Sequence, residues 1–123
     1  MANPNLFNVS TVNGKSVGLT PANTAAAVLL ANSSGSGKSL KIDTIVASSS
    51  GSATVTATVA HNTAAAGSGT STPIITAGQI PPAASLIIID KQTSFYLEEN
   101  TSIVVTSSSA NEVSFLVSYE DIS

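Results

Sequence analysis

Hydrophobic and polar positions alternate with a period of two along several stretches of this chain. The alternation is cleanest at Ala53–Ala60, where alanine and valine alternate with threonine, and at Val113–Tyr119. A strand with one buried face needs an apolar side chain at every second position, and threonine tolerates the exposed face of a sheet. Both stretches therefore predict amphipathic strands. Leu116 breaks the alternation of the second stretch, which indicates contacts on both faces of that strand.

A longer pattern at Lys38–Ala47 predicts a central strand with a bulge or with burial on both faces. Other apolar runs are short, β-branched and closed by turn residues, which favours strands over helices. These runs are Leu6–Val12, Val17–Leu19, Thr72–Ala77, Leu86–Ile89, Ser94–Leu97 and Ile103–Thr106. Residues Asn23–Ala31 fit either a capped two-turn helix or a strand. We favour the strand, because an isolated helix of this length is marginal in water.

Turn residues separate these runs. Asn13-Gly14 predicts a hairpin, because both residues accept the positive φ of a type I′ turn. Ser50-Gly51 and Asn100-Thr101 predict two more hairpin tips. Pro81-Pro82 predicts the end of a strand, since proline has no N–H for the ladder. Gly67-Ser68-Gly69 predicts an exposed loop between two strands.

Strand number and chain length together indicate the fold class. The chain has 123 residues, enough for one domain over residues 1–123. About eight strands at intervals of about ten residues, with no long helical pattern, predict an all-β fold. We expect an antiparallel β-sandwich, jelly-roll or Ig-like, and leave its strand topology open.

The composition is small, neutral and polar. The chain contains 21 serines and 14 threonines, only 9% charged residues, a net charge of −3 and no cysteine. Without cysteine, a disulfide framework, a zinc–thiolate site and a thiol nucleophile are excluded. Four lysines and no arginine provide no basic footprint for phosphates, so we expect no nucleic-acid partner. The longest apolar run, Ala25–Ala31, is too short to cross a bilayer, so we expect no membrane partner.

Few residues are candidates for chemistry. The single histidine, His61, is expected in a loop after a strand that ends at Ala60, with a structural role. Five of the seven acidic residues fall in the last 26 positions, but without the spacing of a calcium loop. Glu120-Asp121 is expected to end the last strand in solvent. We predict no catalytic residue, no cofactor and no metal.

The low content of charged residues bears on the function that we expect. Charged residues are depleted at the centres of protein interfaces, and exposed serine, threonine and alanine lose little entropy when a partner immobilises them. The composition therefore favours a building block whose interfaces supply part of its stability. We expect a homo-oligomer.

Four segments near the two ends of the chain carry a family resemblance. They are Asn3–Lys15, Ile80–Leu86, Phe95–Glu99 and the closing Val117–Ser123, which contains SYEDIS. A polar start, a turn with asparagine or glycine, a proline before an apolar strand and this final strand resemble small virion structural proteins of tailed phages, especially of phages that infect cyanobacteria. The resemblance covers roughly half of the chain, and residues 20–79 match only as a strand pattern.

The resemblance implies a β-sandwich that decorates or joins parts of a phage particle assembled in the host cytoplasm. A capsid cement or decoration protein that binds the major capsid protein is the favoured role, often as a trimer. Other virion proteins of the neck, tail or fibre are alternative partners, and a carbohydrate-binding adhesion module is a further alternative. The terminal segments are the predicted interface, comprising Asn3, Pro4, Asn5, Leu6, Phe7, Tyr119, Glu120, Asp121 and Ile122.

Overall fold

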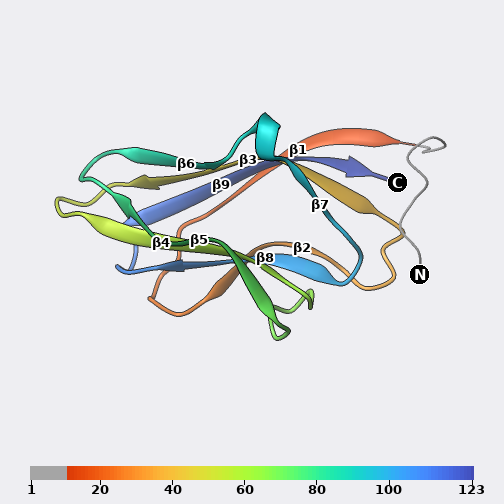
Figure 1. Cartoon of the computed structure of the whole chain (residues 1–123), viewed down its shortest axis with the longest axis horizontal. Helices are drawn as coiled ribbons and strands as arrows, with labels where there is room; N and C mark the ends of the chain where they lie inside the picture. The colour runs from red at the N-terminus through yellow and green to blue at the C-terminus, as the bar shows by residue number, and fades with distance from the viewer. Residues whose placement is uncertain (1–10) are drawn as a thin grey trace.

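The computed structural model describes residues 11–123, and its strands form two antiparallel sheets packed face to face (Figure 1). The elements are β1 (Val12–Leu19), β2 (Ala27–Asn32), β3 (Ser39–Ser49), β4 (Val55–Asn62), β5 (Ser71–Ile80), β6 (Ser85–Ile89), the short 3-10 helix η1 (Lys91–Thr93), β7 (Phe95–Leu97), β8 (Thr101–Ser107) and β9 (Val113–Ile122). The predicted all-β antiparallel sandwich is confirmed, with nine strands in the described part of the chain.

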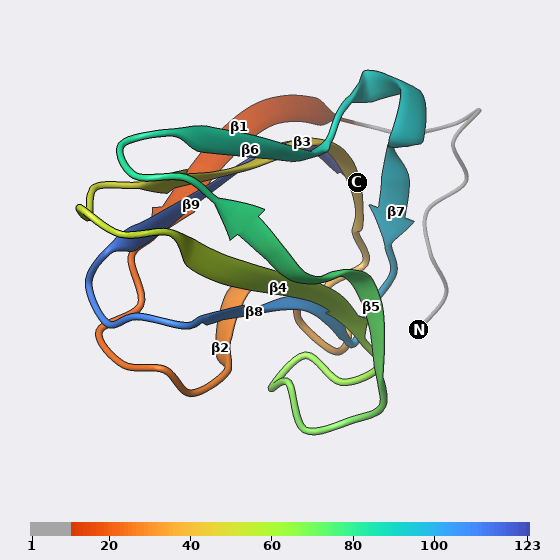
Figure 2. The ribbon, with the colours of Figure 1, turned by 60° about the vertical axis from the view of Figure 1, so that its left-hand side comes forward.

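The strand order distinguishes between the two predicted topologies. Sheet A has the order β1-β9-β3-β6, with β7 pairing another part of β3, and sheet B has the order β2-β8-β4-β5. Consecutive strands mostly lie in different sheets, so the chain crosses repeatedly from one layer to the other (Figure 2). This is the order of a jelly roll, whereas an Ig-like sandwich pairs its first two strands in one sheet.

The core lies between the inward faces of the two sheets. Its largest fully buried side chains are Phe115, Ile42, Ile45, Ile80, Leu97 and Ile103. Each such side chain contributes about 1.5–3 kcal/mol through removal of apolar surface from water. Phe115 is the only aromatic residue among the buried side chains of residues 11–123, so the core is built mainly from aliphatic residues.

The predictions for the middle of the chain are confirmed in most respects. The long strand over Lys38–Ala47 is β3, which pairs with β9 on one side and with β6 and β7 on the other. Its register shifts between Ile42 and Thr44, which is the predicted bulge. The ambiguous segment Asn23–Ala31 contains a strand, β2, and no helix.

The prediction of a hairpin at Asn13-Gly14 is wrong. Both residues lie inside β1, which pairs without interruption with β9 from Val12 opposite Ile122 to Leu19 opposite Phe115. The partner strand is about a hundred residues away in sequence, so no local pattern indicates it. The predicted strand Leu6–Val12 lies almost wholly outside the described residues.

Two other turns are in the predicted places but do not form hairpins. Ser50-Gly51 follows β3 in sheet A and precedes β4 in sheet B. Asn100-Thr101 joins β7 in sheet A to β8 in sheet B, and Asn100 has a φ of 59°. The turns therefore connect the two layers instead of two paired strands. The strand end at Pro81-Pro82 is confirmed, since β5 ends at Ile80.

Candidate docking surface

The outward face of sheet A carries a row of apolar residues across four strands, with side chains on three of them. Strand pairing places Gly18 of β1 opposite Leu116 of β9, Leu116 opposite Val46 of β3, and Val46 opposite Ile87 of β6. Residues directly opposite each other point to the same face of a sheet. Leu116 is 49% exposed and Ile87 is 67% exposed. We call Gly18, Leu116, Val46 and Ile87 the sheet A row.

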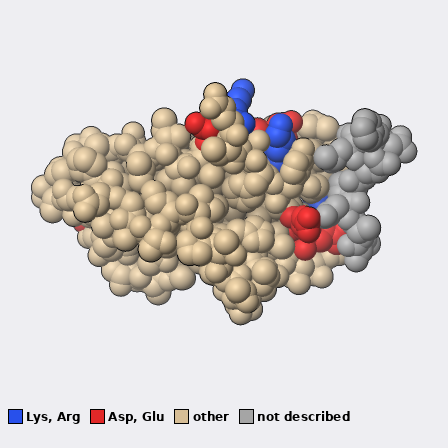
Figure 3. Space-filling view, in the orientation of Figure 1, with Lys and Arg blue, Asp and Glu red and all other residues tan. Residues whose placement is uncertain are grey.

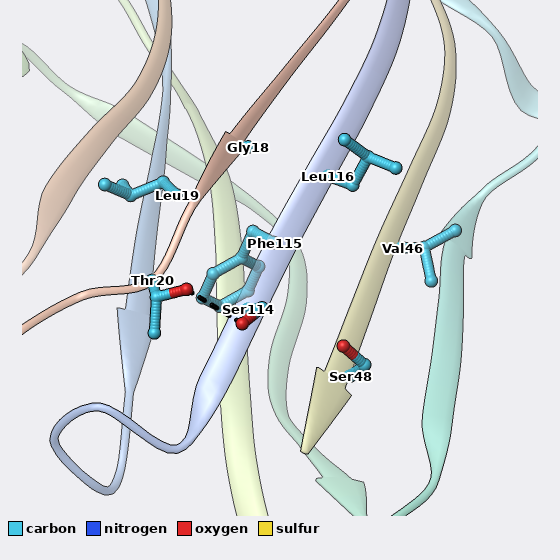
Figure 4. Close-up of a pocket in the computed structure, with 8 residues that line it drawn as sticks. All are labelled: Gly18, Leu19, Thr20, Val46, Ser48, Ser114, Phe115 and Leu116. Carbon is cyan, nitrogen blue, oxygen red and sulfur yellow. Dashed lines mark hydrogen bonds between the residues drawn. The ribbon is translucent and has the colours of Figure 1, made fainter. Parts of the chain in front are cut away.

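A depression of about 410 Å³ lies along β1, β9 and β3 in this row (Figure 4). Gly18 leaves space in it, because a Cβ atom added there would approach Leu116 Cδ1 at 3.8 Å, an ordinary van der Waals distance. The lining residues are Gly18, Leu19, Thr20, Val46, Ser48, Ser114, Phe115 and Leu116. This depression, which we call the groove, is therefore mainly apolar.

Hydroxyl groups border the sheet A row on both sides. The Oγ1 atom of Thr20 and the Oγ atom of Ser114 lie 2.8 Å apart, and the Oγ atoms of Ser16 and Ser118 lie 3.1 Å apart. These hydroxyls bond to each other across the strands, so each already has a partner without water or ligand. The result is an apolar strip with a neutral polar rim, the anatomy of a protein interface.

The sequence alone indicated only part of the sheet A row. Leu116 was indicated by the break in its alternation. Val46 and Ile87 lie in continuous apolar runs, and periodicity does not tell which residues of such a run face inward. The register between β3 and β6 is needed to place Val46 and Ile87 on the outer face.

Charge is concentrated at the opposite end of sheet A. Asp121 is 6% exposed, and its Oδ2 atom accepts hydrogen bonds from Lys15 Nζ at 3.0 Å and Lys38 Nζ at 3.2 Å. Burial alone would raise the pKa of Asp121, but the hydrogen bonds from the two lysines outweigh it and lower that pKa. The same contact raises the pKa of Lys15. In the view of Figure 3 most lysines and acidic side chains lie in the middle and right-hand parts of the molecule, and the left-hand part is almost wholly uncharged.

The expectation that Glu120-Asp121 would end the last strand in solvent is wrong for Asp121. Sheet A places β9 between β1 and β3, so the C-terminal strand is central. Asp121 and Ile122 are consequently buried, and Tyr119 and Glu120 are partly exposed. The C-terminal half of the predicted interface is thus anchored in the sheet instead of free. Its contact with a partner stays a prediction, and Asn3–Phe7 lies outside the described residues.

The outward face of sheet B has a corresponding row, and a loop covers part of it. Register aligns Val28 of β2, Val104 of β8 and Ala60 of β4. We call these three residues the sheet B row. The loop between β4 and β5 lies outside sheet B and packs on this row (Figure 2). A Cβ atom added at Gly67 would lie 3.1 Å from Val28 Cγ2 and 3.3 Å from Val104 Cγ2. Val104 is consequently only 8% exposed.

Asn62 holds that loop in place. Its side-chain amide donates to the carbonyl oxygens of Gly67 and Gly69, each at 3.2 Å, and to Ser71 Oγ at 2.9 Å. Its Oδ1 atom accepts from the backbone N–H groups of Ala64 at 2.9 Å and Gly69 at 3.0 Å. The predicted loop at Gly67-Ser68-Gly69 is confirmed, and it is packed on the sheet.

The remaining chemical candidates form no reactive site in the structure. His61 lies within β4, so its predicted position in a loop is wrong. Its ring meets Phe95 edge to face, with centroids 6.4 Å apart and an interplanar angle of 76°. Residues 11–123 contain no group of three or more histidines and acidic residues arranged to hold a metal ion. Across the same residues, no helix is long and apolar enough to cross a membrane.

Comparison with known proteins shows a similarity of fold alone. No model of a protein family matches the chain, and no curated protein matches it. A solved structure from Bacillus endospore appendages, described as a novel family of disulfide-linked pili, is similar to this chain with a TM-score of 0.52. The two are 15% identical, and the similarity covers 89% of this chain and 85% of the other. At that identity the likeness shows a shared β-sandwich fold.

Proposed function

We propose that this chain is a structural subunit of a tailed-phage particle, a cement or decoration protein that binds the capsid surface through the sheet A row. The uncovered apolar row carries this proposal. Leu116 and Ile87 remain exposed, and the surrounding hydroxyls are neutral and already paired. An apolar strip of this kind marks a site of contact with another protein.

The assignment to a phage particle comes from the sequence resemblance at the two ends of the chain. The fold is compatible with it, because jelly-roll sandwiches are common in viral capsid and lectin domains. The fold is equally compatible with other assemblies, as the pilus relative illustrates. The 123 residues contain no cysteine, so a disulfide-linked assembly is not the model for this chain.

A neck, tail or fibre position is the main alternative within the particle. Copy number separates these positions, because a shell binds its cement at many equivalent sites whereas a closed ring has about a dozen subunits. A carbohydrate-binding role needs aromatic faces for stacking on sugar rings. Phe115 is buried, and Tyr96 is the exposed aromatic side chain among residues 11–123. The sheet A row therefore favours protein contact over sugar contact.

Quantitative mass spectrometry of gradient-purified particles tests the proposal. We expect the chain in the particle fraction at a copy number comparable to that of the major capsid protein. A ratio that corresponds to about a dozen copies would move the protein to the neck or tail. Absence from the particle would overturn the proposal.

Binding of the recombinant chain to particles that lack it tests the surface itself. Leu116→Lys places a charge in the middle of the sheet A row, and we expect at least a tenfold loss of binding. Gln79→Lys is the matched control, because Gln79 is an exposed residue of β5 in sheet B and the charge change is the same. Equal binding of Leu116→Lys and the wild type would exclude the sheet A row as the docking surface.

A further inference from the structure

We propose that β1 pairs with β1 of a second copy in antiparallel orientation, which joins the two A sheets into one continuous sheet. In the part of the chain that the structure describes, β1 is the edge strand of sheet A and pairs only with β9. The inference concerns self-association and goes beyond the proposed docking on a particle.

The unpaired backbone groups of this edge can be assigned. Thr11 and Ser123 exchange two backbone hydrogen bonds, Thr11 N–H to Ser123 O at 3.1 Å and Ser123 N–H to Thr11 O at 3.0 Å. Hydrogen-bonded and non-hydrogen-bonded pairs alternate along an antiparallel ladder. The backbone groups of odd-numbered residues in β1 therefore point toward β9. Those of Gly14, Ser16 and Gly18 point outward at the free edge.

Side chains give this edge little protection. Gly14 and Gly18 have none, and a Cβ atom added at Gly14 would meet nothing within 4 Å. The register with β9 is unbroken over all eight residues of β1, which contain no proline. The single charge of the strand, Lys15, is held by Asp121. Long, regular edges without a proline or a bulge are templates for strand addition.

The other edge strands carry the usual protective features. β5, the outer strand of sheet B on one side, contains Pro73 and two shifts of register. β2, on the other side of sheet B, is six residues long and has a shift between Val28 and Leu30. In sheet A, β6 has only five residues. Among these edges β1 alone lacks a bulge, a proline and a short length.

The residues of β1 match a second copy of themselves in one register. A two-fold axis perpendicular to the sheet through Ser16 pairs Ser16 with its counterpart, Gly14 with Gly18, and Lys15 with Val17. The outward-pointing N–H and C=O groups of Gly14, Ser16 and Gly18 then meet those of the second strand. An axis through Lys15 would also bring outward-pointing backbone groups together, since it pairs Gly14 with Ser16, but it would place two lysines directly opposite each other, which is unfavourable. The placement of the lysines thus favours the register centred on Ser16 over the one centred on Lys15.

Pairing in this register has a consequence for docking, which rests on the proposed function. A two-fold axis perpendicular to the sheet keeps both outward faces on the same side. The two sheet A rows would therefore be presented together to one surface, and binding of one raises the effective concentration of the other.

Disulfide trapping of the full chain tests the register. Opposite residues of a hydrogen-bonded antiparallel pair have Cα atoms roughly 5.5 Å apart, within the range of about 4.4–6.8 Å for a disulfide. The chain contains no cysteine, so Ser16→Cys introduces a single thiol. We expect Ser16→Cys to form a covalent dimer on mild oxidation. Ser118→Cys, on the same face of the neighbouring strand β9, should remain monomeric on non-reducing gels.

Sedimentation velocity tests the pairing without a covalent bond. We expect the wild type to show a concentration-dependent dimer and Ser16→Lys to dimerise at least tenfold more weakly, because it places like charges opposite each other. Ser118→Lys is the control and should match the wild type. If Ser16→Lys does not fold, Ser16→Pro replaces it, because it removes an outward N–H and leaves the β9 ladder intact.

A wild type that is monomeric at all concentrations, a trimer, or a dimer equally weakened by the Ser16 and Ser118 substitutions would overturn the inference. None of these measurements involves particles, so the failure of self-pairing and the failure of the proposed capsid role are separable.

Discussion

The outward faces of the two sheets carry similar apolar rows, but the chain itself covers these rows to different extents. Each has an apolar row across neighbouring strands: Val28, Val104 and Ala60 in sheet B, and Gly18, Leu116, Val46 and Ile87 in sheet A. The chain's own loop covers the centre of the sheet B row, where Val104 is 8% exposed, whereas Val28 at the edge of the row is 37% exposed. Within residues 11–123, no segment covers Leu116 and Ile87 in the sheet A row.

The two rows therefore contribute differently to the stability of the monomer and to binding. Apolar surface covered by the same chain stabilises the monomer, because it is removed from water on folding. Apolar surface that stays exposed contributes only when a second molecule covers it. The sheet B row is therefore mostly covered within the monomer, and the sheet A row is the one that a partner would cover.

The largest expected effect comes from releasing the sheet B loop. Asn62→Ala removes five hydrogen bonds to the loop and to β5 at a side chain that is 1% exposed. We expect the free energy of unfolding to fall by about 3 kcal/mol, since buried backbone groups lose their partners. Urea unfolding measures the loss. Hydrogen exchange should also accelerate at the amides of Ala64 and Gly69.

Asn13→Ala is the control for this substitution, because Asn13 is exposed on β1. It should change stability by no more than about 0.5 kcal/mol. A comparable loss in both variants would mean that Asn62 does not hold the loop specifically.

A smaller effect is expected where the loop touches the sheet. Gly67 has a φ of 79°, and an added Cβ atom would meet both Val28 and Val104 closely. We expect Gly67→Ala to cost about 2 kcal/mol, from left-handed backbone strain together with this crowding. Gly35→Ala separates the two causes, since Gly35 has a φ of 74° with nothing within 4 Å. Its cost in urea unfolding should be about 1 kcal/mol, and equal costs would show that the loop does not press on the sheet.

The sequence indicated the strands better than their partners. Period-two patterns located β4 and β9, because that signal is local. The pairing of β1 with β9 joins residues about a hundred positions apart, and it overrides the local turn preference of Asn13-Gly14. Strand positions alone therefore supported a sandwich and left its topology open.

The same limit applies to the candidate surface. Leu116 was visible from the sequence, because it interrupts a regular alternation. The burial of Asp121 was not visible, because Lys15 and Lys38 lie 106 and 83 positions away from it in sequence. Tertiary contacts of this kind follow from register, and register is set by the whole sheet.

A fall in pH should weaken the charged end of sheet A, whereas the groove contains no charged group that responds to pH. The pKa of Asp121 lies below its ordinary value of 3.8, so its stabilising contribution is present above that value. The contribution is lost as pH falls through the lowered pKa of the folded protein. We expect Asp121→Asn to lose about 1 kcal/mol at pH 7, a modest value because both lysines are substantially exposed.

Urea unfolding between pH 7 and pH 2 measures this dependence. The stability of Asp121→Asn should vary less with pH below 3.8 than that of the wild type. Glu120→Gln is the control, since Glu120 is partly exposed and lies 3.9 Å from Lys41. Its pH profile should follow the wild type. Parallel profiles for the wild type and Asp121→Asn would contradict the assigned role of Asp121.

The smallest expected effect on stability is at the centre of the sheet A row. Leu116→Ala removes a half-exposed side chain, so the free energy of unfolding should change by less than about 0.5 kcal/mol. Val104→Ala removes a smaller side chain from the covered sheet B row and should cost about 1.5 kcal/mol, because its two methyl groups are buried. Urea unfolding of the two variants compares the faces directly. A larger loss for Leu116→Ala than for Val104→Ala would mean that Leu116 is already covered within the monomer, and the sheet A row would then no longer be a surface for a partner.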